Sequence, residues 1–349
     1  MSSHHQNQQS LAILATPAFR NRSSNAYNSI LYSTLQNEGL QILEKLSWSN
    51  LHKANFWHIH WPESFLNDRY LVASLYWLTL FLWRYFLCKI FGLKIIWTVH
   101  NIRPHESRYP YLERWFYRWF PQKCQGLIFL SQYSQKEFFA QTPTARSVPF
   151  LLTRHGHYQS ILNANITQKQ AREKLNLQSD RQIWLFFGML RSYKNLPNLI
   201  RTFKVFHQPN CHLYLWGSPG TDKRIIHQLQ QEIGQNTNIH LTCKRLSESE
   251  LEYAVKAADR IIIPYKKVTN SGSIIYALSC GKAVLSTRVG SLPEIQKYVG
   301  SQALVLAENP LQVEDMESFE QLDLHCPNIK PFDPFSIAQE HIAFYSALT

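Results

Sequence analysis

The stretch from Arg260 to Ile295 carries the residues whose types and spacing best suit the binding of an anion. An apolar strand at Ile261–Ile263 ends in a polar loop, which leads through Ser271-Gly272-Ser273 into a helix. The first backbone N–H groups of a helix have no partner within it and point outward, so a phosphate group suits this position. The same residue types also cap the helix of an ordinary strand–loop–helix turn, so this stretch alone leaves both interpretations open.

Such a loop needs a sheet whose strands end together, and the chain predicts two sheets of this kind. Apolar runs alternate with helical segments, first up to about residue 150 and then again from residue 182. The expected strands are Leu11–Phe19, Leu40–Leu46, Phe56–Trp61, Lys94–His100, Gln125–Ser131, Ala145–Phe150, Gln182–Leu190, Cys211–Gly217, Asn238–Cys243, Ile261–Ile263, Ala283–Thr287 and Ala303–Ala307. The alternation predicts the α/β class, with two doubly wound, Rossmann-like domains built on parallel sheets.

The chain length suits two domains, and we place their boundaries as follows. Residues 1–10 are a polar, disordered lead-in without the basic-then-apolar order of a signal peptide. Residues 11–160 form the first domain, 161–325 the second, and 326–349 a tail that ends in a helix. That last helix, Pro334–Leu348, is amphipathic, and it packs either on the second domain or back on the first.

Ligands of doubly wound sheets lie outside the carboxyl ends of the strands. In the first domain this rule selects the loops at Phe19–Asn25, Trp61–Glu63 and His100–Glu106. These loops offer carboxylates and imidazoles, the groups that most often take a proton from a reacting hydroxyl.

Most of the positive charge lies in the first half of the chain. Residues 1–155 contain 16 Lys and Arg against 7 Asp and Glu, a net +9, whereas residues 156–349 contain 20 against 17, a net +3. Such an excess suits nucleic acid, anionic lipid or a phosphorylated substrate. No nucleic-acid-binding motif accompanies the charge, so we expect no nucleic-acid partner. The 6 scattered cysteines contain no C-x-x-C pair, which is typical of a reducing cytosol.

Basic and aromatic residues alternate along Glu113–Lys123, and a long apolar helix is expected at Asp68–Phe91. The uncharged part, Tyr70–Trp83, has about 14 residues and is shorter than the ~20 that cross a bilayer, so we expect a buried or membrane-surface helix. Aromatic rings with Lys and Arg favour the headgroup level of an anionic membrane. This predicts a cytoplasmic protein held peripherally at the inner face of the cell membrane. A core helix whose basic side chains reach outward is the alternative.

A series of motifs runs through the second half in a recognisable order. They are Gly188-Met-Leu-Arg191-Ser-Tyr-Lys194, Trp216-Gly217-Ser218, Ala258-Asp259, Ser271-Gly272-Ser273, Ala277 to Val284, and Val289 to Ile295. Together they resemble the family 4-type, or group 1, glycosyltransferases of the GT-B fold. The first half is similar more loosely, through Asn25-Ala-Tyr27-Asn28, His58-Ile-His60-Trp61-Pro62-Glu63 and Thr98-Val-His100-Asn101. The resemblance implies two Rossmann-like domains facing a cleft, the first for the acceptor and the second for a nucleotide sugar.

The resemblance also implies a donor site. Gly188, Arg191 and Lys194 are expected to reach the diphosphate of a sugar nucleotide, and the helix that begins at Ser271-Gly272-Ser273 is expected to donate backbone N–H groups to it. Fixed positive groups that stabilise a leaving group are usually a large part of catalysis. No cofactor is expected beside the nucleotide sugar itself.

The chain departs from the family's pattern at two positions. These enzymes usually carry two glutamates eight positions apart, and the aligned positions here hold Val268 and Tyr276. We expect Asn270 and Ser271 to substitute by hydrogen bonding, and Glu294 is the nearest remaining acid. This is therefore a divergent member.

Catalytic roles in the first domain follow from the resemblance as well. A histidine at the end of the fourth strand faces the donor sugar in the family, and His100 holds that place. If configuration is inverted, a general base must take the proton of the acceptor hydroxyl. Glu63, Glu106, His60 and His105 lie in strand-end loops, and Glu63 is our first choice; a retaining reaction requires no such base of the protein. The remaining residues expected to line the acceptor side or the cleft are Asn25, Tyr27, Asn28, His60 and His105.

The pairs His58-x-His60 and His155-x-His157 have spacing that suits a metal, because alternate strand residues share a face. No carboxylate or cysteine completes either pair in the sequence, and enzymes of the GT-B fold generally need no bound metal, so we expect none.

The sequence thus predicts a glycosyltransferase of the hexosyl type. It would move a sugar from a nucleotide-diphosphate sugar to a saccharide or lipid-linked saccharide, in the synthesis of exopolysaccharide or a cell-surface glycan. One alternative is a non-catalytic GT-B-like subunit that binds a glycan or a partner, which the missing glutamates favour. A sugar-nucleotide epimerase on the same fold is the other, and the same loss argues against it.

Overall fold

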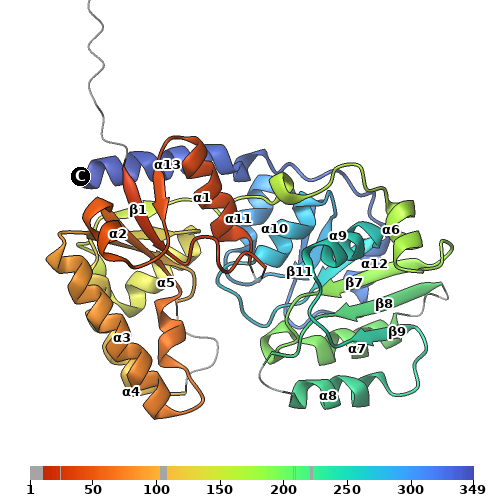
Figure 1. Cartoon of the computed structure of the whole chain (residues 1–349). Helices are drawn as coiled ribbons and strands as arrows, with labels where there is room; N and C mark the ends of the chain where they lie inside the picture. Colours follow the sequence, from red (N-terminus) through yellow and green to blue (C-terminus); the bar gives the residue numbers. More distant parts are fainter. Residues whose placement is uncertain (1–10, 24, 103–107, 207, 209, 221–222) are drawn as a thin grey trace, which may run out of the picture. The chain divides into compact units, whose positions relative to one another are not determined.

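The computed structural model describes residues 11–23, 25–102, 108–206, 208, 210–220 and 223–349. The chain divides into two compact units, one made of residues 1–156 and 334–349 and the other of residues 157–333. Each unit is built on a six-stranded sheet in which every described pair of strands is parallel (Figure 1). The prediction of the α/β class with two Rossmann-like units is confirmed.

The first unit has the strand order β2-β1-β3-β4-β5-β6. Its strands are β1 Ala12–Thr16, β2 Gln41–Leu43, β3 Phe56–His60, β4 Lys94–Val99, β5 Gly126–Phe129 and β6 Phe150–Leu152. Its helices are α1 Tyr27–Asn37, α2 Trp48–Lys53, α3 Leu71–Ile90, α4 Pro110–Trp119, α5 Gln132–Gln141 and α13 Pro334–Leu348, with the 3-10 turns η1 Pro62–Leu66, η2 Pro121–Lys123 and η3 Pro143–Ala145.

Successive residues of a strand point to opposite faces, and this alternation gives the first unit two cores. Ile95, Trp97 and Val99 of β4 pack in a cluster with residues of α3, α4 and α5. Ile96 of the same strand packs in a second cluster with residues of α1 and α13. Both faces of the sheet are thus covered, as the near-continuous apolar strands require.

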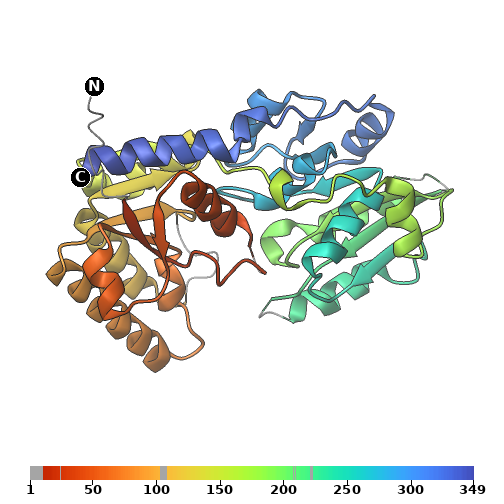
Figure 2. The same cartoon turned by 45° about the horizontal axis from the view of Figure 1, so that its top comes forward.

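The C-terminal helix α13 belongs to the first unit. Its residues Ile337, Ala338 and Tyr345 are buried in the cluster that also contains residues of α1. Figure 2 shows α13 running beside α1, in line with their packing contacts. Of the two expected arrangements, the return of this helix to the first domain is the one found.

The second unit has the strand order β12-β11-β10-β7-β8-β9. Its strands are β7 Gln182–Phe187, β8 Cys211–Trp216, β9 Ile239–Thr242, β10 Arg260–Ile263, β11 Val284–Thr287 and β12 Leu304–Ala307. Its helices are α6 Gln168–Lys174, α7 Leu196–Val205, α8 Arg224–Ile233, α9 Glu248–Ala257, α10 Gly272–Ser279, α11 Leu292–Val299 and α12 Val313–Gln321, with the 3-10 turns η4 Gln159–Ile161, η5 Ser192–Lys194 and η6 Lys330–Phe332.

Each strand order contains one point at which the direction of winding reverses. In the second unit the chain moves outward from β7 through β8 to β9, then returns to β10 and moves the other way. Crossovers between parallel strands are right-handed, so those that lead from β7 toward β9 and those that lead from β10 toward β12 place their helices on opposite faces of the sheet. Ligands of such sheets bind where the loops separate, at the carboxyl ends of these two strands. The corresponding point of the first unit lies between β1 and β3.

Several expected elements differ from those found. The strand expected at Ala145–Phe150 is displaced to β6 Phe150–Leu152, because the prolines at 143 and 149 favour a 3-10 turn and a loop before it. The helix expected over Asn163–Ser179 is limited to α6. Helices α2 and α12 were not expected at all. Residues 157–160 and 326–333 belong to the second unit, so the chain changes unit slightly earlier, and returns slightly later, than the expected boundaries at 160 and 325.

Candidate active site

The carboxyl end of β7 begins the candidate donor site of the second unit. Gly188 follows β7 with a φ of +117°, a conformation that residues with a side chain rarely adopt. A Cβ atom added at Gly188 would lie 3.4 Å from Oγ of Ser273 and 4.0 Å from Nζ of Lys194. The glycine therefore leaves space between a hydroxyl at the start of α10 and an ammonium group that follows β7.

Lys194 is the buried cation of this site. Its exposed fraction is 4%, and Nζ donates a hydrogen bond of 2.8 Å to the hydroxyl of Tyr265. Burial lowers the pKa of Lys194 to about 8. Neither Lys194 nor Arg191 takes part in the ion pairs found among the described residues. A buried charge without a counter-ion is costly, and an anion bound here would offset that cost.

Tyr265 joins this lysine to the start of α10. Its hydroxyl lies 2.7 Å from Oγ of Ser271, and Nζ of Lys194 lies 4.2 Å from the centroid of its ring. Ser271 in turn caps the helix, since its Oγ accepts a hydrogen bond of 3.2 Å from the backbone N–H of Ile274. The loop after β7 and the helix after β10 are thus held together by side chains at the point where the winding reverses.

Close backbone contacts shape the loops around Arg191. A Cβ atom at Gly217 would lie 1.6 Å from the carbonyl oxygen of Gly188, so only glycine fits there. A Cβ atom at Gly220 would lie 3.6 Å from Nε of Arg191. The guanidinium group therefore lies beside the turn that follows β8, in the same group of strand-end loops as Lys194.

The two positions that the family pattern assigns to glutamates are used for packing. Val268 is buried, and a Cβ atom at Gly290 would lie 1.7 Å from its carbonyl oxygen. Tyr276 is also buried, and its ring lies edge-on to those of Tyr158 and Phe187, with centroids 5.3 and 6.0 Å away. Burial raises the pKa of Tyr276, so its hydroxyl is neutral. Two half-buried residues, Asn270 before α10 and Glu294 in the first turn of α11, complete the expected donor residues.

In the first unit, His100 is held from three sides at the end of β4. Its Nε2 lies 2.8 Å from Nδ1 of His60. Its ring stacks on that of Trp61, with centroids 4.1 Å apart and an angle of 17° between the planes, and Tyr27 meets it edge-on at 5.2 Å. Trp61 has a φ of +49°, which is unusual for a bulky residue and is typical of functional positions. Such a firmly held imidazole suits a catalytic role.

Glu63 lies in η1, directly after β3, and its exposed fraction is 5%. The side-chain amide of Asn101 donates a hydrogen bond of 2.9 Å to its Oε1. Burial raises the pKa of Glu63 to about 7, and the bond from Asn101 lowers the pKa only in part. A carboxylate with a pKa near neutrality is suited to act as a general base. His100 and Asn101 directly follow the neighbouring strand β4, so the candidate acid–base residues lie at the same, carboxyl end of the sheet.

The other expected residues of the first unit differ in their surroundings. Tyr27 is buried against His60, His100 and His155. Asn25 is half-buried, and its side chain accepts a hydrogen bond of 3.0 Å from the backbone N–H of Tyr27. Asn28 is fully buried and donates to the carbonyl oxygen of Pro17 at 2.6 Å. His105 lies outside the described residues.

The histidine pairs with metal-like spacing make other bonds. Nδ1 of His58 and Nε2 of His60 both lie within hydrogen-bond distance of the hydroxyl of Tyr32, at 2.8 and 2.7 Å. His155 bonds the carbonyl oxygen of Gly156 through Nδ1. In the part of the chain that the structure describes, no group of three or more His, Cys, Asp or Glu is arranged to hold a metal ion.

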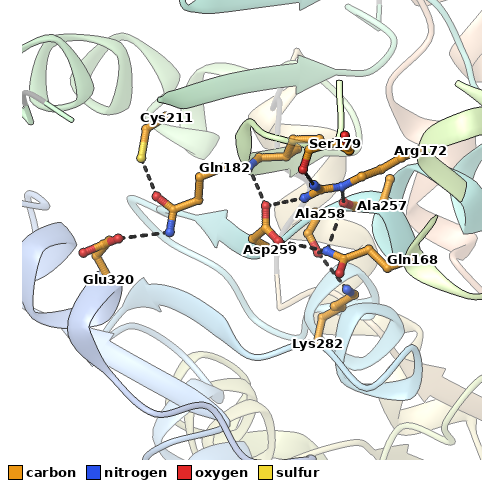
Figure 3. A network of polar contacts seen from close by, with 11 residues as sticks. Gln168, Arg172, Ser179, Gln182, Cys211, Ala257, Ala258, Asp259, Lys282 and Glu320 are labelled. Atoms are coloured by element: carbon orange, nitrogen blue, oxygen red, sulfur yellow. Dashed lines mark hydrogen bonds and ion pairs between the residues drawn. The ribbon is translucent and has the colours of Figure 1, made fainter. Parts of the chain in front are cut away.

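A network of polar contacts lies at the opposite, amino ends of the strands of the second unit, before β7 and β10 (Figure 3). Asp259 accepts hydrogen bonds from Arg172 at 2.5 Å, from Gln168 at 2.9 Å and from the backbone N–H of Ile183 at 2.7 Å. Lys282 donates to the carbonyl oxygen of Ala258 at 2.7 Å. These groups satisfy one another at the amino ends of the strands, so we assign them a structural role.

Two residues of the candidate site were not expected from the sequence. Trp61 lies in a strand-end motif, but no role was expected for it from the sequence. Its position between a strand and Pro62 was the available signal, because a proline there indicates that the chain turns abruptly. Tyr265 directly follows Pro264 at the end of β10, and that position is the signal that could have identified it. Each supports an expected residue, Trp61 through stacking on His100 and Tyr265 through its bond to Lys194.

Comparisons with known proteins agree with this geometry. Residues 167–318 match the family described as glycosyl transferases group 1, which includes the loops of the donor site. The chain is 25% identical over 300 residues to a GDP-mannose:glycolipid 4-beta-D-mannosyltransferase of Xanthomonas campestris, and the match covers 85% of this chain and 80% of that protein.

Solved structures share the fold over nearly the whole chain. Sucrose-phosphate synthase of Thermosynechococcus elongatus matches with a TM-score of 0.70 at 14% identity, covering 97% of this chain and 99% of the other. The Anabaena HepE protein in complex with UDP-glucose matches with a TM-score of 0.67 at 14% identity, covering 97% and 100%. A glycosyltransferase of Rickettsia africae matches with a TM-score of 0.66, also at 14% identity, covering 97% and 98%. Residues 167–318 belong to the group 1 glycosyltransferases, and the chain is a glycosyltransferase of the GT-B fold.

Proposed function

We propose that the second unit binds a nucleotide-diphosphate sugar and that the enzyme transfers its sugar to a saccharide carried on a lipid. The observation that carries this proposal is the space beside Gly188, where the hydroxyl of Ser273 and the buried ammonium group of Lys194 converge. A diphosphate placed there would meet both groups and the N-terminus of α10, whose backbone N–H groups favour anions.

The chemistry of transfer explains why the cations are needed. As the bond between the sugar and the diphosphate breaks, its electron pair and negative charge pass to the diphosphate. Lys194 and Arg191 would stabilise that charge where it develops, and groups fixed in advance do so without reorganising. We propose that these two residues supply the positive charge at the leaving group and that no bound metal is required.

The relatives suggest which substrates to try first. The Xanthomonas relatives are named for GDP-mannose and a glycolipid acceptor, and the Anabaena structure contains UDP-glucose. We therefore propose GDP-mannose as the first donor to test and UDP-glucose as the second. A glycolipid acceptor would place the enzyme in the synthesis of exopolysaccharide or of a cell-surface glycan.

In the first unit, we assign Glu63 as the general base of an inverting transfer. Its carboxylate would take the proton of the acceptor hydroxyl, while the hydroxyl oxygen forms its bond to the sugar. The pKa of about 7 leaves a large fraction of Glu63 ionised and still basic enough to accept a proton at neutral pH. We assign His100, directly after the neighbouring strand β4, as the second catalytic residue of the first unit.

An exposed apolar surface on α3 and α4 suits the lipid part of such an acceptor. Helix α3 is long and apolar enough to cross a membrane, but Leu78, Phe81 and Tyr85 on one face are buried in the first unit. Its other face is exposed, and Val72 and Ile90 are 79% and 77% exposed. The exposed large apolar residues of the two helices are Leu71, Val72, Leu75, Tyr76, Trp77, Trp83, Phe86, Ile90, Tyr111 and Trp115.

Basic residues surround this apolar surface. Arg69, Lys89, Arg114 and Arg118 are exposed on the same two helices or directly beside them. Exposed aromatic and aliphatic side chains with Lys and Arg around them are typical of a helix that lies in the headgroup region of an anionic membrane. We propose that this surface holds the enzyme peripherally at the cytoplasmic face of the membrane, where lipid-linked saccharides are extended.

Ligand binding and transfer test the enzymatic part of the proposal. Unfolding of the full chain is followed with GDP, UDP, ADP and dTDP, because a ligand that binds only the native state stabilises it by about 2.7 kcal/mol at a concentration 100 times its Kd. We expect a rise in Tm with at least one nucleotide and transfer from the matching sugar nucleotide to a polyprenyl-diphosphate saccharide. The absence of both binding and transfer with every donor would overturn it.

Sedimentation with vesicles tests the membrane part separately. The full chain should sediment with vesicles that contain phosphatidylglycerol and less with vesicles of phosphatidylcholine alone. Added salt should weaken the binding, because it screens the basic residues. Replacement of Val72 and Ile90 by Ser should reduce it further. Equal binding to both kinds of vesicle, or none to either, would refute this part of the proposal.

A further inference from the structure

Below the candidate catalytic histidine, a continuous series of hydrogen bonds crosses the interior of the first unit. Nε2 of His58 lies 2.7 Å from Oγ1 of Thr98, and its Nδ1 lies 2.8 Å from the hydroxyl of Tyr32. That hydroxyl lies 2.7 Å from Nε2 of His60, whose Nδ1 lies 2.8 Å from Nε2 of His100. Four of these residues are buried, and His100 at the outer end is half-buried.

The alternation of strand residues explains why these groups meet. His58 and His60 on β3, and Thr98 on β4, share the face that α1 and α13 cover. Helix α1 contributes Tyr32 to this face, and α13 contributes Tyr345, whose hydroxyl also lies 2.8 Å from Nδ1 of His58. A polar group buried in this way must be bonded, and the groups of the series serve as partners for one another.

The imidazoles of the series are neutral. Burial lowers the pKa of His58, His60 and His100, and the neighbouring histidines lower each of them further. Among the described residues, the other titratable groups that face the series are His341 and Tyr345 of α13, His155, Tyr27 and Glu44. A positive charge on any of these rings would be unfavourable, so the series does not store a proton.

In a neutral series, the position of each proton fixes the next. A neutral imidazole has one N–H group and one bare nitrogen, and a hydroxyl donates one hydrogen bond. When Tyr32 donates to Nε2 of His60, His60 carries its proton on Nδ1 and donates to Nε2 of His100. When Tyr32 instead donates to His58, His60 carries its proton on Nε2, and His100 must donate through its own Nε2. The direction of the hydroxyl of Tyr32 therefore decides the tautomer of His100.

We propose that Tyr32 and His60 are positioning residues that set the tautomer and the orientation of His100 for sugar transfer. The proposal rests on the proposed function only for the role of His100 in catalysis. The tautomer decides whether Nδ1 of His100 donates or accepts a hydrogen bond, and a hydroxyl of the sugar in the wrong arrangement would lose that bond. Misplacement of a catalytic group by about 1 Å can reduce a rate by about 100-fold.

The structure provides a matched pair of variants for the test. Tyr32→Phe and Tyr345→Phe each remove one fully buried hydroxyl that lies 2.8 Å from the same nitrogen of His58. Only the hydroxyl of Tyr32 continues to His60. The two variants should lose similar stability, but Tyr32→Phe should disturb His100 more. Tyr345→Phe leaves the bonds that join Tyr32 through His60 to His100 in place and acts only through the competition for Nδ1 of His58.

The first measurement needs no substrate. The ¹⁵N chemical shifts of labelled histidine side chains distinguish the two tautomers, and His100→Gln identifies the signals of His100. We expect Tyr32→Phe to change the ratio of N–H to bare nitrogen at His100, and Tyr345→Phe to change this ratio less, because it keeps both bonds between Tyr32 and His100. Equal spectra of His100 in the wild type and in Tyr32→Phe would overturn the proposal, whatever reaction the enzyme catalyses.

The second measurement uses the transfer reaction. Tyr32→Phe should lower kcat by about 10-fold to 100-fold with little change in KM for the donor, because it acts through an oriented group. His60→Gln, whose amide can still bond to Nε2 of His100, should retain more activity than His60→Ala. An equal loss of kcat in Tyr32→Phe and Tyr345→Phe would show a merely structural effect and refute the role. If no variant or wild type transfers sugar while the ¹⁵N result holds, the assigned reaction is wrong and the coupling of the tautomers stands.

Discussion

At the amino ends of β7 and β10, the charged groups of the second unit are bonded to one another. At the carboxyl ends of the same strands, Lys194 and Arg191 form no ion pair with the residues that the structure describes. Asp259 is paired with Arg172 and also receives hydrogen bonds from Gln168 and the backbone (Figure 3). The side chain of Lys194 is more deeply buried than that of Asp259, and its described side-chain hydrogen bond is to the neutral hydroxyl of Tyr265.

The comparison separates charge that stabilises the fold from charge that is prepared for a ligand. A paired and bonded group has little to gain from another partner, so its loss affects folding. A buried cation without an anion costs stability in the free enzyme and gains from a bound diphosphate. The same reasoning applies in the first unit to Glu63, a buried carboxyl group whose described side-chain partner is the neutral amide of Asn101.

The largest effect is expected for Glu63→Gln. Loss of the general base should lower kcat by about 10²-fold to 10⁴-fold. The variant should also be more stable than the wild type at pH 8. The folded pKa of about 7 lies above the ordinary value of 4.5, so the folded state loses stability as the pH rises through this window, and the cost persists above pH 7. The rise in pKa from 4.5 to about 7 corresponds to roughly 3 kcal/mol.

Steady-state rates and urea unfolding at pH 5 and pH 8 measure both effects. The gain in stability should be present at pH 8 and small at pH 5. A variant that is both active and no more stable at pH 8 would show that Glu63 is an ordinary buried side chain.

The substitutions Lys194→Met and Lys282→Met compare the carboxyl ends of the strands with their amino ends. Both lysines have a pKa lowered by burial, but Lys282 lies at the amino ends of the strands, where it donates a hydrogen bond to the carbonyl oxygen of Ala258. Lys194→Met should reduce kcat/KM for the donor by about 10²-fold, the usual loss when one group that stabilises a developing charge is removed. Lys282→Met should change it less than twofold. Similar losses in the two variants would contradict the location of the diphosphate.

Asp259→Asn should have the opposite effect: it should lower stability and leave nucleotide binding unchanged. The substitution preserves shape but leaves Arg172 without its carboxylate, and we expect a loss of about 2 kcal/mol in the free energy of unfolding. The Kd for the nucleotide, measured by calorimetry, should remain within twofold of the wild type, because the network lies at the far edge of the sheet. A large change in Kd with unchanged stability would contradict the structural role that we assign to the amino ends of the strands.

The smallest effect is a dependence of donor binding on pH. Lys194 is charged below its pKa of about 8, so the Kd for a nucleoside diphosphate should increase by about tenfold between pH 7 and pH 9. Lys194→Arg should abolish this dependence, because arginine stays charged throughout this range. The same dependence in Lys194→Arg would assign it to another group.

Much of the fold could be predicted from the sequence, because a parallel sheet buries both faces and its strands read as apolar runs. All 12 strands of the two units were expected, and only β6 was displaced. The helices that were missed have weak patterns. Helix α2 has a single buried residue, Leu51, and α12 has two, Met316 and Phe319, within an acidic sequence.

The candidate site was less predictable. Motif order indicated Gly188, Arg191 and Lys194, since their spacing along the chain is itself the signal. The bond from Lys194 to Tyr265 joins residues 71 positions apart, and no local pattern reports such a pair. Likewise, the bonds of His58 to Tyr32 and Tyr345 depend on how two helices pack on one sheet face, and the sequence indicated only that each element exists.

The return of α13 to the first unit has a consequence for synthesis on the ribosome. Domains usually fold in the order in which they are made. Here the core of the first unit includes Ile337, Ala338 and Tyr345, so that unit stays incomplete until translation reaches the last residues of the chain. The second unit, residues 157–333, is made in full before then and has what it needs to fold first. In a released chain that ends at residue 333, the second unit should therefore resist protease better than the first.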